Sequence, residues 1–222
     1  MSVVIAIDGT AACGKGTIAR ALARHYGFAH LDSGALYRLV ALGVLEAGGD
    51  PANPEDAVRS AGALDLTLAG DPKIRTDVVG AAASKVAAIP AVRAALVDFQ
   101  RDFAQRPPGN SQGAVIDGRD IGTVIVPDAA AKLFIDARAE VRARRRLLEL
   151  QGLGISRNPD DLAAELVARD AADRSRAISP LKQAEDAVLL DTSDLDIEAA
   201  FAKALDLVNP RIEKALAARP RG

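Results

Sequence analysis

The stretch AIDGTAACGKGT, residues 6–17, limits what this chain can fold into more than any other part of the sequence. It ends the short apolar run SVVIAIDG and opens a segment with Ile18, Leu22 and Tyr26 at helical spacing. A strand, a glycine-rich turn and a helix in direct succession are the context in which the pattern G-x-x-x-x-G-K holds phosphate. Glycines let the backbone come close, and N–H groups at the helix start face the anionic oxygens. The sequence therefore predicts a phosphate-binding loop at residues 9–17.

The residue after Lys15 departs from the usual pattern, because Gly16 stands where Ser or Thr is expected. Thr17, one position later, still supplies a hydroxyl group. GTPases also need a guanine-reading loop of the Asn-Lys-x-Asp type, whereas every Asn in this chain is followed by Pro or Ser. The sequence therefore disfavours a regulatory GTP switch, and the loop alone leaves the phosphate acceptor open.

Short apolar runs alternate with helical segments along most of the chain. We expect strands at 2–9, 28–34, 113–118, 131–137 and 186–193. We expect helices at 15–26, 35–47, 91–105, 138–151, 160–175 and 197–216, with Pro210 interrupting the last pattern and Asp32 and Ser33 as candidate caps of the second helix. Alternating strands and helices form a parallel sheet that is covered on both faces. The predicted fold is α/β, with a five-stranded parallel sheet and helices on both faces.

Residues 50–90 break this alternation. GDPANPEDAV is rich in turn residues and ends in a helix start. LDLTLAGDPKI (64–74) alternates apolar and polar residues around a Gly-Asp-Pro turn, so we interpret it as a small antiparallel hairpin. The whole region reads as an insert in an otherwise alternating fold.

Composition excludes several classes of protein. A chain of 222 residues suits one α/β domain, and no apolar run approaches the ~18 residues of a membrane span. The net charge of −2 gives no reason to expect a nucleic-acid surface. The single Cys13 excludes an intrachain disulfide and fits a reducing compartment. We expect a cytoplasmic protein with neither a membrane nor a nucleic acid as partner.

Three stretches place arginines beside small or acidic residues where strands or loops are expected to end. They are LDSGALYR, VIDGRDIGT and RDAADRSRAISPL. Ligands of open α/β sheets bind outside the carboxyl ends of the strands, and a guanidinium group matches phosphate oxygens. A single such Arg is more often a surface ion pair, but several converging loops favour a site for a second phosphorylated molecule. The candidate residues are Ser33, Arg38, Asp117, Arg119, Asp120, Arg169, Asp173 and Arg176.

Five motifs together resemble those of bacterial cytidylate kinases, which are P-loop nucleoside monophosphate kinases. They are GTAACGKGT, LDSGALYR, ASKVAAIPAVR, DGRDIGT and RDAADRSRAISPL, in the family's order between residues 9 and 181. DGRDIGT with LDSGALYR is far more specific than the phosphate loop, since adenylate kinases share Gly-Lys-Gly-Thr but differ after the third strand. The resemblance implies a single domain with a core (about 1–34, 107–151 and 176–222), a monophosphate-binding insert (about 35–106) and a short lid (about 152–175).

The resemblance implies an enzyme that uses ATP and Mg²⁺ to phosphorylate CMP and dCMP, acting as a monomer. Thr17 and Asp117 would be the protein oxygens nearest to Mg²⁺. Arg145 or Arg146, from the run RAEVRARRRLLEL, would close over ATP, although our default interpretation of that run is a solvated, ion-paired helix face. The loop residues implied to hold the ATP phosphates are Gly9, Thr10, Ala11, Ala12, Cys13, Gly14, Lys15, Gly16 and Thr17.

The resemblance also assigns the acceptor site in three groups. Arg38, Arg119 and Arg176 would grip the phosphate of CMP and, with Lys15, act in catalysis. The cytosine ring would be read by Ser33, Arg93 and Asp120, and the sugar by Ser84, Arg169 and Asp173. A carboxylate can accept from the N4 amino group of cytosine, whereas uracil has a carbonyl there.

Several alternatives stay open at this point. The enzyme could instead be a UMP/CMP kinase or another monophosphate kinase, or the chain could be a nucleotide sensor that binds ATP without transferring phosphate. Asp120 and Asp173 could cap helices or pair with a nearby Arg, and Asp117 could be a capping carboxylate. His25 and His30 are interpreted as structural.

Overall fold

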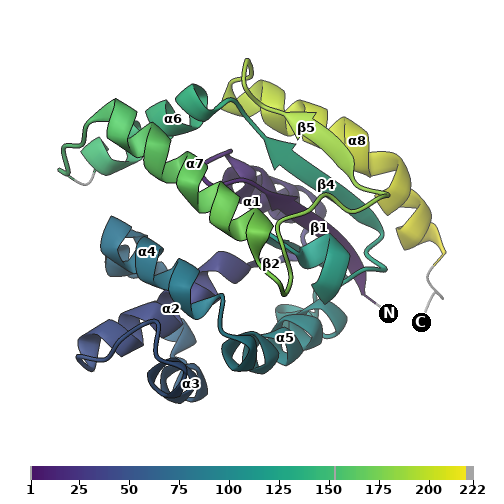
Figure 1. The fold of residues 1–222 in the computed structure, drawn as a ribbon. Coiled ribbons are helices and arrows are strands. Elements are labelled where there is room, and N and C mark those ends of the chain that lie inside the picture. The colour runs from purple at the N-terminus through teal and green to yellow at the C-terminus, as the bar shows by residue number, and fades with distance from the viewer. Residues whose placement is uncertain (1, 153, 219–222) are drawn as a thin grey trace. The chain divides into compact units, whose positions relative to one another are not determined.

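The computed structural model describes residues 2–152 and 154–218, which form two compact units. The core unit comprises Met1–Leu31 and Ala104–Gly222, and the insert unit comprises Asp32–Phe103. The strands are β1 (Val3–Gly9), β2 (Ala29–Asp32), β3 (Gly113–Gly118), β4 (Ala131–Asp136) and β5 (Val188–Asp191). The α-helices are α1 (Lys15–Tyr26), α2 (Ser33–Glu46), α3 (Pro54–Gly62), α4 (Asp77–Val86), α5 (Pro90–Gln105), α6 (Ala139–Gly152), α7 (Pro159–Ser175) and α8 (Ile197–Ala217) (Figure 1).

The five strands form one sheet in the order β2-β3-β1-β4-β5. β1 pairs in parallel with β3 and β4, and β4 pairs in parallel with β5. The phosphate-loop strand β1 is therefore central, and all seven of its residues are buried. The predicted α/β fold is confirmed. Because parallel strands end at the same edge, the loops after β1, β3 and β4 emerge side by side.

One face of the sheet is packed by α1 and α8. Ile18 and Leu22 of α1 and Val208 and Ile212 of α8 join the β-strand side chains in a single buried cluster. The spacing of these residues is helical, so each helix presents one apolar stripe to the sheet. α8 runs from Ile197 to Ala217 with Pro210 inside it, so the single helix expected at 197–216 is confirmed.

The fifth strand is present but shorter than the predicted 186–193, since β5 spans Val188–Asp191. β5 lies at the edge of the sheet, and the side chain of Leu189 is exposed. Only Val188–Asp191 pairs with β4, so the residues on either side of it in the predicted strand lie outside the sheet.

The insert unit is helical throughout, so the predicted hairpin at 64–74 is wrong. Two short 3₁₀ segments occupy this stretch, η1 (Leu66–Gly70) and η2 (Pro72–Arg75). The side chain of Asp65 accepts the N–H of Thr67, and that of Asp71 accepts the N–H of Lys73. These local side-chain bonds favour turns over strand pairing. The helix start predicted after residue 50 is α3, capped by Asn53.

The helix α4 was not expected from the sequence. Thr76 caps it by accepting the N–H of Val79, and Val79, Ala82, Ala83 and Val86 are buried within the insert unit, where α4 packs on α2. Its small side chains gave little periodic signal. The cap of α2 is confirmed for Asp32, which accepts the N–H of Ala35, whereas Ser33 is the first helical residue.

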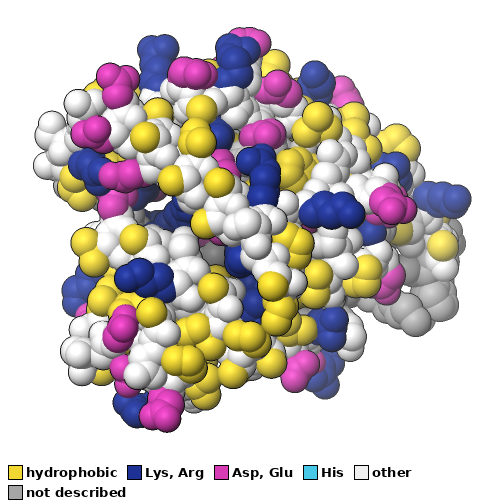
Figure 2. Space-filling model, viewed as in Figure 1, with side chains coloured by type: hydrophobic (Ala, Val, Ile, Leu, Met, Phe, Trp, Pro, Cys, Tyr) yellow, Lys and Arg dark blue, Asp and Glu magenta, His cyan; other side chains and the backbone are white. Residues whose placement is uncertain are grey.

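Among the described residues, no single helix is long and apolar enough to cross a membrane, although the bent pair Asp77–Val86 and Pro90–Asn110 passes on length and composition together. Basic and acidic side chains are interspersed on the face seen in Figure 2.

Candidate functional site

The phosphate loop follows β1 directly and opens α1, as predicted. A Cβ atom at Gly9 would lie 2.0 Å from the carbonyl oxygen of Ile135, so only glycine fits where the loop leaves the sheet. Ala12 and Gly14 both adopt positive φ angles, 58° and 91°, which turn the backbone into a concave loop. The ammonium group of Lys15 reaches back to the carbonyl oxygen of Thr10 at 2.9 Å. The loop therefore holds its lysine over its own backbone.

The carboxylate of Asp8 holds the loop strand and the DGRDIGT segment together, a role that the sequence did not suggest. Asp8 is buried and accepts the N–H groups of Ile121 and Gly122, each at 2.8 Å. These amides begin a short π-helical turn, η4 (Ile121–Ile125), directly after Asp120. Burial raises the pKa of Asp8 to about 7, against the lowering effect of the two N–H bonds. The sequence offers a sign of this role, since Asp8 is a charged residue in an otherwise apolar strand.

Asp117 lies buried at the end of β3, close to the start of α1. One carboxylate oxygen is 2.8 Å from Nε2 of His30, and the other would be 3.6 Å from a Cβ atom at Gly16. His30 is thus partnered to a predicted metal-site residue, which the sequence reading did not foresee. Thr17, the other predicted metal residue, is exposed in the first turn of α1.

Few protein groups are available for a metal ion. Within residues 2–152 and 154–218, no cluster of three or more His, Cys, Asp or Glu side chains could hold one. A single carboxylate and a hydroxyl suit Mg²⁺, which keeps several waters and takes its other ligands from substrate phosphates. The residues present therefore fit that ion and would not build a closed protein site.

The arginines of the core unit that are predicted to bind the acceptor lie around Asp173 of α7. Nε of Arg119 lies 2.8 Å from one of its carboxylate oxygens, and Nη2 of Arg176 lies 2.6 Å from the other. Burial alone would raise the pKa of Asp173, but the charges of Arg119 and Arg176 outweigh it and lower the pKa below its usual value. We call Arg119, Arg169, Asp173 and Arg176 the arginine cluster.

The arginine cluster carries more positive charge than Asp173 can balance. Burial and the nearby charge of Arg119 lower the pKa of Arg169 to about 10. The Nε atoms of Arg169 and Arg176 are buried and have no hydrogen-bond partner among the described residues. Buried donors of this kind are normally satisfied, so they point to an anionic ligand. Asp120, next to Arg119, is buried at the start of η4.

The insert unit holds the remaining predicted acceptor residues. Arg38 on α2 donates to the carbonyl oxygens of Ile74 at 2.6 Å and Thr76 at 3.5 Å. Arg93 on α5 is buried, donates to the carbonyl oxygen of Ala87 at 3.3 Å, and lies over the ring of Tyr37 at 5.4 Å.

The two predicted serines lie on separate helices of the insert unit. Ser33 is buried at the start of α2, and the hydroxyl of Ser84 on α4 donates to the carbonyl oxygen of Gly80 at 3.4 Å.

From the sequence, we interpret the arginines of α6 as a solvated, ion-paired helix face. That interpretation is wrong for Arg142 and Arg145, which bond to groups of the core unit. Arg142 is buried and paired with Asp170. Arg145 donates to the carbonyl oxygens of Cys13 and Thr192 and to the hydroxyl of Thr192. Arg146 pairs with Glu149 one turn later, at 2.8 Å. The helix therefore rests on the phosphate loop through charged side chains.

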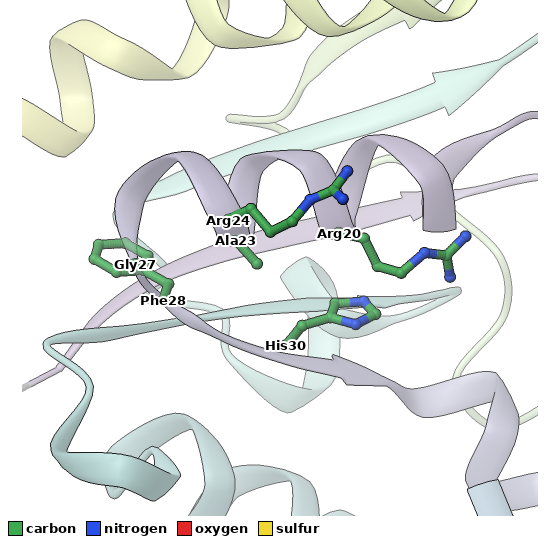
Figure 3. Close-up of a pocket in the computed structure, with 6 residues that line it drawn as sticks. All are labelled: Arg20, Ala23, Arg24, Gly27, Phe28 and His30. Carbon is green, nitrogen blue, oxygen red and sulfur yellow. The ribbon is translucent and has the colours of Figure 1, made fainter. Parts of the chain in front are cut away.

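A separate hollow of about 480 Å³ lies beside the other end of α1. Figure 3 shows Arg20 and Arg24 projecting from α1 and His30 from β2, with Phe28 at one end. His30, which lines this hollow, is also the residue that pairs with Asp117.

A phosphate loop on a parallel sheet, with a partly buried arginine cluster at the same edge, defines a P-loop kinase of small molecules. The cytidylate kinase family model matches residues 5–210, and the chain belongs to that family. A cytidylate kinase of Rhodospirillum rubrum is 51% identical over 95% of this chain and 99% of its own length. One of Acidiphilium cryptum is 55% identical over 93% of this chain and 95% of its own.

The fold is also similar to that of a gluconokinase from Sinorhizobium meliloti. That crystal structure has a TM-score of 0.51 and 14% identity, and covers 98% of each chain.

Proposed function

We propose that this chain transfers the γ-phosphoryl group of ATP to CMP and dCMP, giving CDP and dCDP. Membership of the cytidylate kinase family supports the reaction. The observation that carries it is the arginine cluster, with its buried unsatisfied donors, at the same sheet edge as the phosphate loop. A protein that only sensed ATP would have no use for a second phosphate clamp.

The donor site is proposed at the loop Gly9 to Thr17, where backbone N–H groups and Lys15 would hold the ATP phosphates. Thr17 and Asp117 would hold Mg²⁺, in part through water. When bound, Mg²⁺ neutralises charge that develops on the transferred phosphoryl group. Arg145 and Arg146 would lie on the ATP side, with 152–175 as the lid.

The acceptor site is proposed in the three groups that the family motifs imply. Arg38, Arg119 and Arg176 would bind the phosphate of CMP, and Ser84, Arg169 and Asp173 its sugar. Ser33, Arg93 and Asp120 would read the base. The charges of the arginine cluster support this assignment. Asp173 balances only part of the positive charge of its three arginines, and a dianionic phosphate can balance the rest.

Discrimination of cytosine from uracil would depend on Asp120. Its carboxylate accepts a hydrogen bond from the N4 amino group of cytosine. In uracil a carbonyl oxygen would face the same carboxylate, and two opposed acceptors destabilise the complex. A site built on such a bond rejects the analogue strongly.

The chemistry needs positioning and charge stabilisation more than proton transfer. The acceptor oxygen of CMP is already anionic near neutral pH, so no general base is required. Lys15 would follow the phosphoryl group in transfer, and Arg119 and Arg176 would stabilise its equatorial oxygens. Closure of the insert and the lid would exclude water and suppress ATP hydrolysis. We propose a monomer that acts in the cytoplasm.

The test is release of ADP from ATP and Mg²⁺ in a coupled assay with AMP, GMP, UMP, CMP or dCMP as acceptor. We expect CMP and dCMP to be phosphorylated far faster than the others. Equal rates with UMP and CMP would contradict a cytosine-specific site. Tight ATP binding without ADP release in the presence of CMP would contradict the kinase reaction and favour a nucleotide sensor.

A further inference from the structure

An ion pair between α6 and α7 lies beneath the phosphate loop and has no part in the proposed substrate contacts. Asp170 of α7 is 1% exposed, and Arg142 of α6 is 6% exposed. Nη1 of Arg142 bonds directly to a carboxylate oxygen of Asp170, and its Nε donates to the carbonyl oxygen of Ala137 at 2.9 Å. The two helices lie side by side (Figure 1).

Both polar backbone groups of one loop residue are held by this pair. The N–H of Ala11 donates to Asp170 Oδ1 at 3.0 Å, and its carbonyl oxygen accepts from Arg142 Nη1 at 3.1 Å. The next residue, Ala12, has φ of 58°, a left-handed conformation that costs energy for any residue except glycine. Such a conformation persists only where surrounding contacts determine it, and the ion pair supplies them immediately before the turn.

Stability alone does not explain a charged pair at this place. Ala11, Ala143 and Leu166 pack together beside it, and the charges of Arg119 and Arg169 lie near enough to act on Asp170. Burying two ions is costly, and well-packed apolar side chains of similar size often replace such a pair at no loss of stability. An apolar pair could not bind the N–H and carbonyl groups of Ala11. Compared with an apolar pair, Arg142 and Asp170 therefore add the two hydrogen bonds to Ala11 of the loop.

The same helix also reaches the arginine cluster. Asp173 lies three residues after Asp170, one turn along α7, and pairs with Arg119 and Arg176. One turn of α7 thus presents one carboxylate to the phosphate loop and the next to the acceptor-side arginines.

We infer that Arg142 and Asp170 are positioning residues that set the shape of the phosphate loop and fix it in register with the arginine cluster through α7. This inference rests on the proposed function for its kinetic consequences, although its effect on nucleotide binding does not. Neither residue is among the proposed substrate contacts. Loss of the pair would let the loop relax at Ala11 and Ala12, so ATP would bind less well, while the CMP contacts, held by other residues, would change less.

The experiment uses three variants of the full chain and one control. Asp170→Asn keeps an acceptor for the N–H of Ala11 but leaves Arg142 without its charge partner, and Asp170→Ala removes both. The double variant Arg142→Met with Asp170→Leu replaces the pair by apolar side chains. Asp206→Asn, at an exposed position on α8, is the matched control for loss of an aspartate charge. Each is measured for melting temperature, for KM of ATP and of CMP, and for binding of a non-hydrolysable ATP analogue by calorimetry.

We expect Asp170→Ala to raise KM for ATP and Kd for the analogue by about tenfold or more, KM for CMP by no more than about threefold, and Asp170→Asn to lie between it and wild type. The double variant should recover the melting temperature but not the ATP affinity. If it recovers both, the pair is only structural and the inference is wrong. Unchanged affinities in both Asp170 single variants would also overturn it. Should wild type fail to phosphorylate CMP, the proposed function fails, and the analogue Kd values still decide the inference.

Discussion

Two arginines of the core unit share a carboxylate partner, and two arginines of the insert unit bond to backbone carbonyl oxygens. In the core unit, Arg119 and Arg176 are fixed by the carboxylate of Asp173. In the insert unit, Arg38 and Arg93 donate to backbone carbonyl oxygens, at Ile74, Thr76 and Ala87. A carboxylate partner holds a guanidinium group by charge attraction. A carbonyl partner holds it at a place that depends on the local backbone conformation.

This difference predicts different sensitivities. The core arginines should respond most to changes of charge, since a lost partner leaves a buried ion uncompensated. The bonds of Arg38 to Ile74 and Thr76 should also respond to changes of backbone shape in η2 and at the start of α4. Asp71 accepts the N–H of Lys73 at the start of η2, the segment in which Ile74 supplies its carbonyl oxygen to Arg38.

The largest effect is expected from Arg119→Ala in the arginine cluster. Removal of one buried charged contact to the acceptor phosphate should cost about 2–4 kcal/mol, roughly 30- to 1,000-fold in kcat/KM for CMP. It also removes the main positive charge near Asp173, so the pKa of that carboxyl should rise toward its usual value. The coupled ADP-release assay measures the first effect, and a change under twofold would show that Arg119 is misassigned.

A pH-dependent effect is expected from Asp8→Asn. The pKa of Asp8 is about 7 in the folded protein and near 3.8 in the unfolded chain, so folding favours its protonated form. This contribution is fully present below about pH 4 and is lost as pH rises through about 7. The wild-type stability should therefore fall relative to the variant by up to about 1 kcal/mol per pH unit between these values.

Urea unfolding of both proteins at pH 4.5, 5.5, 6.5 and 7.5 tests this expectation. If the free energies of unfolding of wild type and variant changed in parallel with pH, the raised pKa of Asp8 would be contradicted. Asp8 would then act only by accepting the N–H groups of Ile121 and Gly122.

The smallest effect is expected from Gly80→Ala in the insert unit. A Cβ atom there would lie 3.2 Å from Nη2 of Arg38, so the guanidinium must shift by a few tenths of an ångström. We expect KM for CMP to rise roughly fivefold, well short of the ~100-fold that a 1 Å displacement can cause. Stability should not fall, because alanine favours a helix over glycine by about 1 kcal/mol. Gly62→Ala in α3, where nothing lies within 4 Å, is the matched control. Equal KM values for both variants would show that Arg38 is not held as we describe.

The core unit could be predicted from the sequence because its signals are periodic and mutually consistent. Apolar runs, the glycine loop and the helical spacing of Ile18 and Leu22 all indicate one parallel sheet, and α1 begins and ends where expected. The arginine cluster was also accessible, since its residues stand in short motifs after predicted strands.

The rest depended on contacts that a sequence does not display. Arg142 looked like one of several arginines on a solvated helix, because its partner Asp170 lies 28 positions away. The stretch 64–74 alternates like a hairpin, but Asp65 and Asp71 bond to their own backbone and turn it into 3₁₀ segments. The role of His30 similarly depended on Asp117, which approaches it only across the sheet.

The central claim is that this site phosphorylates cytosine monophosphates and reads the base through Asp120. The most direct measurement is the ratio of kcat/KM for CMP to that for UMP, determined in parallel for wild type and Asp120→Asn. The account predicts a large ratio in wild type and a clear fall in the variant, since asparagine can donate to the uracil carbonyl. A wild-type ratio near one, or a ratio that the substitution leaves unchanged, would contradict it.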